Sequence, residues 1–354
     1  MKKFDFSIVV CCYRGEETII RCLNSLICQN YYLSTYEIII VDDGSIDNSS
    51  SIILDYLNNL KNNIPSIKYY RTDNNGLSKA RNFGINFSQG DYILFIDEDA
   101  EASKEWLSEY KKTIDSRNSP DVIYGNVLPF NNAGKFEKFI SHNFYIKVNK
   151  NGNIIPVLVG TNMGYKKKIF NNAGFFDDFI YRGDETIFLS SLNFQYTSYS
   201  NVNAYVFHKN PENLYQWLVE RMQNGESNLL VNYFKIRILK IDTITNLYLR
   251  ILKRIIIITF FIGSFAYSLS ILPVVVVSSI YLYYLYKEEL IGRKIYLNNK
   301  NYNNQTLIII VSICIRFLGN IAKEYGFILK LLKTKPNFTN KKSFTEHIQK
   351  FLLK

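Results

Sequence analysis

Apolar positions in the N-terminal part of the chain fall into two kinds of pattern. Three largely apolar runs, at 6–12, 37–41 and 92–96, are typical of strands buried on both faces of a sheet, and a further short strand is predicted at 67–71. Between them, apolar residues recur at helical spacing in three segments, 17–28, 48–60 and 76–87. Strands that alternate with short helices predict an α/β domain with a mostly parallel, Rossmann-like sheet.

One of these strands ends in a run of acids. Residues 93–96 are all large and apolar, and Asp97, Glu98 and Asp99 follow them directly. Negative charge at the end of a buried strand is costly unless a cation compensates it. On an extended backbone, side chains two residues apart point the same way, so one of Asp97 and Asp99 can bind Mg²⁺ or Mn²⁺ while the other reaches a ligand hydroxyl. A solvated acidic loop is the alternative.

The ends of several predicted strands carry polar or aromatic residues. In sheets of this kind, ligands bind beyond the carboxyl ends of the strands. This rule brings Tyr13, Asp43, Arg71 and the acids of 97–99 to one crevice. The Tyr13 ring offers a flat surface on which a nucleotide base can stack. We therefore expect a single ligand site at this edge of the sheet.

Charge divides the chain into two parts. The net charge of the whole chain is +11, but residues 1–234 carry −3 and residues 235–354 carry +14. Such asymmetry suggests contact with anionic lipid or nucleic acid. The uncharged run 255–286 exceeds the ~20 residues that a membrane helix needs, which favours lipid over nucleic acid. We predict a catalytic domain at 1–234 and a basic, helical membrane-attachment region at 235–354.

Two membrane arrangements fit this region. In the first, 255–286 forms an apolar hairpin that turns near Pro273, with both ends on the cytoplasmic side. In the second, a kinked helix over 258–285 crosses once and a second apolar segment, 306–322, returns. A hairpin buried inside a soluble fold is the remaining alternative.

Cysteine usage and the N-terminus bear on the compartment. The five cysteines form neither a paired metal spacing nor a disulfide framework, which favours a reducing compartment. The first residues contain no cleavage site and predict a strand in place of a signal peptide. We therefore expect the catalytic domain at the cytoplasmic face of the cell membrane.

Several blocks of sequence together resemble family 2 glycosyltransferases with the GT-A fold. They are IVVCCY at 8–13, EIIIVDDGS at 37–45, NGLSKARNFG at 75–84, DED at 97–99, GTNM at 160–163, GFFD at 174–177 and GDET at 183–186. The resemblance covers roughly residues 5–230. It implies a nucleotide-diphosphate sugar donor, most simply a UDP-sugar, and a glycan or lipid-linked acceptor.

The resemblance also implies a set of donor-binding residues. They are Cys11, Tyr13, Glu16, Asp43, Lys79, Arg81, Asp97, Glu98 and Asn162. Asp43 is expected to contact uracil, and the helix that carries Lys79 and Arg81 to face the diphosphate. Ordinary turn surface is the alternative for Tyr13 and Glu16, and a solvated basic helix face is the alternative for Lys79 and Arg81.

The expected cofactor is a divalent metal, Mg²⁺ or Mn²⁺. Asp99 is the first metal ligand, and Asp97 either shares the metal or contacts ribose. In similar proteins a histidine at the end of a late strand approaches the metal, and His208 follows the strand-like segment 204–207. The metal would stabilise the departing nucleoside diphosphate.

An inverting transfer needs a carboxylate that takes the proton of the acceptor hydroxyl. Family members usually have Glu-Asp at this point, with the second residue as the base. This chain has the reverse order, Asp184-Glu185, so Glu185 aligns with the base and Asp184 is its neighbour. Helix capping is the alternative role for both.

We therefore expect a metal-dependent inverting glycosyltransferase of polysaccharide biosynthesis. Two other functions remain open. A sugar nucleotidyltransferase is disfavoured because residues 12–16 lack a Gly-rich basic loop after the first strand. A non-catalytic membrane scaffold that binds nucleotide sugars would show no donor turnover.

Overall fold

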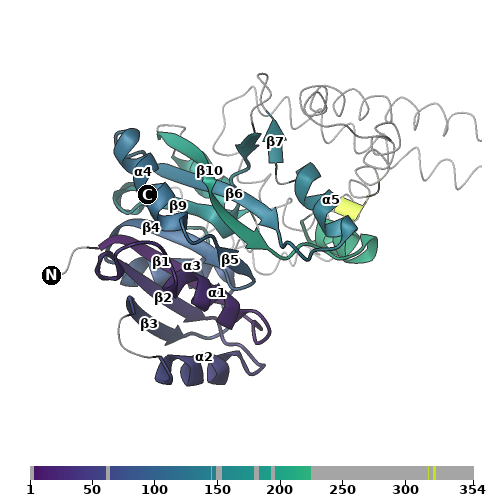
Figure 1. Ribbon diagram of the computed structural model, residues 1–354, viewed down its shortest axis with the longest axis horizontal. Coiled ribbons are helices and arrows are strands. Elements are labelled where there is room, and N and C mark those ends of the chain that lie inside the picture. Colours follow the sequence, from purple (N-terminus) through teal and green to yellow (C-terminus); the bar gives the residue numbers. More distant parts are fainter. Residues whose placement is uncertain are drawn as a thin grey trace, which may run out of the picture.

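Figure 1 shows the computed structural model of the chain. It describes residues 4–60, 64–144, 146–148, 154–178, 183–192 and 196–224, with 318 and 322–323. The predicted membrane segment 255–286 and nearly all of 306–322 lie outside the described residues, so the division at 234 stays a prediction. Within the described parts, no helix combines the length and the apolar content that a bilayer crossing requires.

The described strands form one large sheet and one small one. The large sheet has the order β3-β2-β1-β4-β9-β6-β10-β5. Its strands are β1 Phe4–Cys12, β2 Tyr36–Asp42, β3 Ser66–Arg71, β4 Gly90–Asp97, β5 Ala100–Ala102, β6 Val122–Pro129, β9 Met163–Lys166 and β10 Ser198–His208. The small sheet pairs β7 Ile146–Val148 with β8 Ile154–Pro156.

Helices connect most of these strands. They are α1 Ile19–Ile27, α2 Ser49–Asn58, α3 Leu77–Phe87, α4 Trp106–Ser116, α5 Lys135–Phe144, α6 Lys168–Ala173 and α7 Asp184–Ser191, with 3₁₀ turns η1 Leu33–Thr35 and η2 Gly160–Asn162. Figure 1 shows α2 beside the β3 edge of the sheet. The predicted helices and strands of the N-terminal part are confirmed to within a few residues.

The sheet is mixed, whereas the sequence predicted a mostly parallel one. The β3-β2-β1-β4 half is parallel throughout. Strand β9 runs antiparallel to both β4 and β6, and β5 runs antiparallel to β10. The sequence indicated neither β5 nor β9, because strands of three and four residues are too short to show a clear apolar run.

Side chains of the central strand β1 alternate between two cores. Phe6, Ile8 and Val10 pack with residues of α1, α2 and α4, whereas Val9 and Cys11 pack with residues of α3, α6 and α7. The sheet is therefore the middle of three layers. This arrangement explains why β1 and β4 are apolar at nearly every position and not at alternate positions.

The register of the central strands aligns their carboxyl ends. Cys11 of β1 lies beside Asp97 of β4, and Cys12 lies beside Asp42 of β2. The residues that follow these three strands consequently start from one edge of the sheet. This alignment is what the predicted crevice requires.

Candidate active site

A cavity of about 900 Å³ lies at this edge of the sheet. Ten of the predicted site residues line it: Cys11, Tyr13, Asp43, Arg81, Asp97, Glu98, Asp99, Asp184, Glu185 and His208. Three others do not, and these are Glu16, Lys79 and Asn162. The structure thus brings residues from β1, β4, α3, α7 and β10 to one space large enough for a drug-sized ligand.

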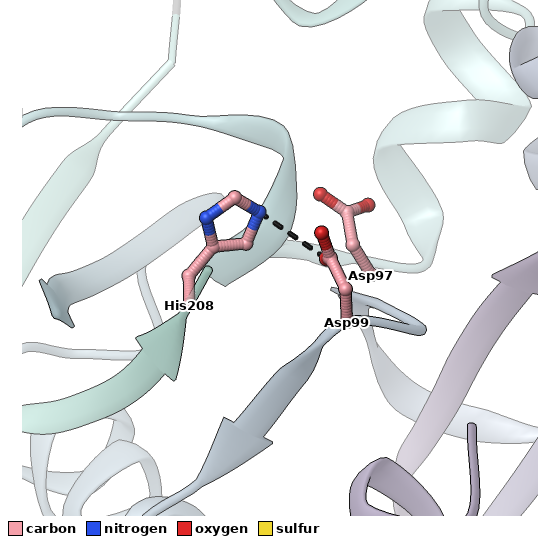
Figure 2. A group of neighbouring side chains, drawn as sticks. All are labelled: Asp97, Asp99 and His208. Atoms are coloured by element: carbon pink, nitrogen blue, oxygen red, sulfur yellow. Dashed lines mark ion pairs between the residues drawn. The ribbon is translucent and has the colours of Figure 1, made fainter. Parts of the chain in front are cut away.

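Three side chains at this edge form a candidate metal site. One ligand atom from each of Asp97, Asp99 and His208 lies within 4.8 Å of the others, and Figure 2 shows the side chains turned toward one another. His208 Nε2 is 3.2 Å from Asp99 Oδ1. Carboxylate oxygens and an imidazole nitrogen are ligands that Mn²⁺ and similar divalent ions accept, so the donor set fits the expected metal.

The backbone reaches this arrangement by a route that the sequence did not indicate. Strand β4 ends at Asp97, and Asp99 lies in the turn before β5, not on an extended backbone. Strand β5 then pairs with β10, which places His208 opposite Ala100. His208 is therefore brought to Asp99 by the β5–β10 pairing, more than 100 residues apart in the chain.

The acid cluster holds more negative than positive charge. Burial raises the pKa of Glu98, and the neighbouring Asp99 and Asp97 add to this effect and bring it to about 8. Burial favours neutral imidazole, but Asp99 and Asp97 outweigh it and raise the pKa of His208 to about 9. Burial also opposes ionisation of Asp99, yet His208 holds the pKa of Asp99 below its usual value. The cluster therefore attracts a cation.

Arg81 contacts the Asp97 side of the acid cluster and is only 3% exposed. Its Nη1 donates to both carboxylate oxygens of Asp184, at 2.8 Å each, and its Nη2 is 3.4 Å from Asp97 Oδ1. The guanidinium thus binds two protein carboxylates, whereas the sequence predicts that it faces the donor diphosphate. The partner on α7 follows Arg81 by 103 residues, so no local pattern could indicate this pairing.

The two carboxylates at the start of α7 differ in charge state. Burial opposes ionisation of Asp184, but Arg81 outweighs it and holds the pKa of Asp184 below its usual value. Burial raises the pKa of Glu185 to about 8, and the charge of Asp184 and a hydrogen bond with it contribute. A carboxylate that exchanges its proton near neutral pH is suited to general-base chemistry.

Tyr13 and Asp43 also line the cavity. The Tyr13 ring is 37% exposed, and the Arg14 guanidinium carbon lies 5.4 Å from its centroid. Asp43 is buried and accepts hydrogen bonds from Asn75 N at 3.0 Å and Gly76 N at 2.8 Å. Asp43 therefore fixes the loop that begins α3, a role that the sequence did not indicate, while it also lines the cavity.

Two of the three predicted residues outside the cavity, Glu16 and Lys79, lie on the protein surface. Glu16 is exposed and accepts hydrogen bonds from Asn48 N and Nδ2, both at 3.0 Å, so it supports the start of α2. Lys79 is exposed on α3. Arg71, which was expected in the crevice, instead donates to Ser45 O at 2.8 Å and does not line the cavity.

Asn162 is fully buried and holds the loop that lines the cavity. Its Oδ1 accepts from Trp106 Nε1 at 2.8 Å and from Tyr110 Oη at 2.5 Å. Its Nδ2 donates to Asn126 O and Ala204 O, at 2.7 and 3.0 Å. The side-chain amide is therefore satisfied by α4, β6 and β10, and Asn162 acts by positioning η2. The spacing of Trp106, Leu107, Tyr110 and Ile114 would have revealed α4 in the sequence.

Known proteins resemble the N-terminal part of the chain in sequence and in fold. Residues 7–174 match the family model described as Glycosyl transferase family 2. This match, which covers a little less than half of the chain, agrees with the resemblance of the sequence blocks to that family. Among solved structures, the mannosyltransferase PcManGT from Pyrobaculum calidifontis, in complex with GDP-Man and Mn2+, matches with a TM-score of 0.52 at 14% identity, covering 66% of this chain and 64% of that one. This likeness shows the fold.

Curated relatives are named glycosyltransferases. The poly(ribitol-phosphate) beta-N-acetylglucosaminyltransferase TarS of Staphylococcus aureus is 29% identical over 198 residues, which cover 56% of this chain and 33% of that protein. The poly(ribitol-phosphate) beta-glucosyltransferase of Bacillus spizizenii is 36% identical over 133 residues, which cover 36% of this chain and 20% of that protein. The chain thus spans a third or less of the length of these two relatives.

Proposed function

We propose that this chain is a metal-dependent inverting glycosyltransferase. It would move a sugar from a nucleotide-diphosphate donor, most simply a UDP-sugar, to a hydroxyl of a lipid-linked or surface glycan. One observation carries the proposal: the Asp97, Asp99 and His208 cluster shares a single cavity with Tyr13 and Glu185. The names of the relatives, which act on poly(ribitol-phosphate), support a surface polymer as the acceptor.

Different residues of the cavity suit different parts of the reaction. The exposed Tyr13 ring can stack on the nucleobase, and this stacking directs the diphosphate toward the acid cluster. A divalent cation held by Asp97, Asp99 and His208 would supply Lewis-acid compensation for the charge on the leaving diphosphate. Glu185, on the side of α7, would take the proton of the acceptor hydroxyl as this oxygen attacks the anomeric carbon.

Residues 235–354 belong to the proposal only as a prediction. Their net charge of +14 and the uncharged run 255–286 support attachment to an anionic membrane at its cytoplasmic face. Such attachment would hold the cavity near a membrane-bound acceptor.

The proposal is tested by donor turnover. The purified 354-residue chain is incubated with a panel of UDP- and GDP-sugars, with Mn²⁺ or Mg²⁺, and release of nucleoside diphosphate is measured with and without poly(ribitol phosphate). We expect metal-dependent release that falls by about 10²-fold or more in Asp99→Asn. The matched control Asp115→Asn, an exposed acid on α4, should retain full turnover. Donor binding without turnover, or turnover that EDTA and Asp99→Asn leave unchanged, would contradict the proposal.

A further inference from the structure

The two adjacent carboxylates of α7 have different surroundings. Asp184 is 1% exposed, and both of its oxygens accept from Arg81 Nη1 at 2.8 Å. Ser78 Oγ adds a third hydrogen bond to Asp184, at 3.3 Å. Glu185 is more exposed than its neighbour and lines the same cavity. The hydrogen-bond acceptors of Asp184 are thus occupied by α3.

The Arg81 side chain is held in place from several sides. Its guanidinium lies between Asp184 and Asp97, and its central carbon is 5.8 Å from the centroid of the Phe95 ring. Gly160 lies close against it as well, because a Cβ at this position would lie 2.4 Å from Arg81 Nη2. Arg81 is therefore a rigid link between the metal-site carboxylate on β4 and the carboxylate pair on α7.

We propose that Arg81 is a positioning residue that determines which of the two carboxylates acts as the base. It binds Asp184 as a carboxylate ion and so leaves Glu185 to exchange the proton with the acceptor hydroxyl. The inference deepens the proposed function and rests on it. It also explains how the chain can carry the two carboxylates in reversed order. Asp184, the first of the two, is held in the ion pair with Arg81 and does not take part in the proton transfer.

The charges around Glu185 predict opposite effects for the two partners. Asp184, on the same helix, favours protonated Glu185, whereas Arg81 on α3 favours ionised Glu185. The phenol of Tyr165 on β9 also lies close enough to interact with Glu185 and stays neutral at ordinary pH. Removal of Arg81 should therefore strengthen proton binding by Glu185, and removal of the Asp184 charge should weaken it.

The test is the pH profile of kcat/KM, measured at saturating metal. The acid limb of this profile reports the pKa of the general base in the free enzyme. We expect Asp184→Asn to move the acid limb to lower pH and Arg81→Met to move it to higher pH, each by on the order of one pH unit. Arg81→Lys keeps the charge but has one nitrogen in place of the two that contact Asp184 and Asp97, so the acid limb of this variant should lie closer to that of the native chain than the limb of Arg81→Met does. The matched control Arg117→Met, at the end of α4, should leave the profile unchanged.

The outcomes separate this inference from the proposed function. If the native chain shows no transfer, the proposed function fails. If the native chain transfers sugar but Arg81→Met and Asp184→Asn move the acid limb in the same direction, or not at all, Arg81 is merely structural and the inference is wrong. Should Arg81→Met not fold, the double variant Arg81→Met/Asp184→Asn is compared with Asp184→Asn. If the acid limb of the double variant lies at higher pH than that of Asp184→Asn, the inference is supported. If the two acid limbs lie at the same pH, the inference is overturned.

Discussion

Buried carboxylates occur at both ends of the sheet, and their surroundings differ. Near the amino end of β2, Glu37 is fully buried and accepts from Ser7 Oγ at 2.6 Å, Gln89 N at 2.6 Å and Lys68 Nζ at 2.8 Å. Its charge is therefore compensated by the chain itself. We call Glu37 with these three partners the amino-end cluster.

At the carboxyl end, the chain leaves its acids incompletely compensated. Seven carboxylates line the cavity there: Asp43, Asp97, Glu98, Asp99, Asp184, Glu185 and Glu220. Among the five on β4, on the turn after it and on α7, Asp97 and Asp184 form ion pairs with Arg81, and Asp99 forms one with His208. Burial and, secondarily, the neighbouring carboxylates raise the pKa values of Glu98 and Glu185 to about 8. The comparison indicates that the amino-end cluster stabilises the fold, whereas the carboxyl-end acids are arranged for a ligand and cost stability.

The largest expected effect is on Glu185. Glu185→Gln should lower turnover by about 10²- to 10⁴-fold, because the side chain can no longer accept the proton. The same change should raise the melting temperature. The folded-state pKa of about 8 exceeds the ordinary value of 4.5, so ionisation destabilises the fold increasingly between these pH values. The gain should therefore be larger at pH 8 than at pH 5, as thermal unfolding can measure.

The matched control for this prediction is Glu105→Gln, an exposed acid before α4. It should change neither turnover nor the pH dependence of melting. A Glu185→Gln variant that melts lower than the native chain at pH 8 would show that this carboxylate stabilises the fold, and the contrast between the two ends would then be wrong.

The second prediction concerns the amino-end cluster. Glu37→Ala should lower the free energy of unfolding by about 3 kcal/mol, because it leaves Lys68, Ser7 and Gln89 N without their shared acceptor. Urea denaturation measures this loss. Turnover per folded molecule should stay close to that of the native chain. Lys68→Met is the comparison variant, since it removes the partly exposed member of the pair and keeps the other two donors.

The smallest expected effect is at Lys79. Its exposed side chain does not line the cavity, so Lys79→Met should leave the donor KM within about twofold of the native value, as for a surface substitution away from special features. Steady-state kinetics with the preferred donor checks this. A large increase in KM would show that Lys79 contacts the donor, as the sequence predicts.

The sequence predicted most of the parallel half of the sheet and much of the site. Continuous apolar runs mark β1, β2 and β4, and a general rule about strand ends then brings their following residues together. The partners of individual side chains could not be predicted in this way. Arg81 binds Asp184, and Asn162 binds Trp106, only because helices far apart in the chain pack on the same sheet.

Gly160 limits how this cavity can be redesigned. Even the single methyl group of alanine would lie 2.4 Å from Arg81 Nη2, and that nitrogen cannot withdraw while Asp184 and Asp97 hold the guanidinium. A mutant library that aims to change sugar preference should therefore keep position 160 constant and vary the more tolerant rim around Asn74, which is exposed. The lack of a side chain at position 160 therefore determines the shape of the cavity wall beside Arg81.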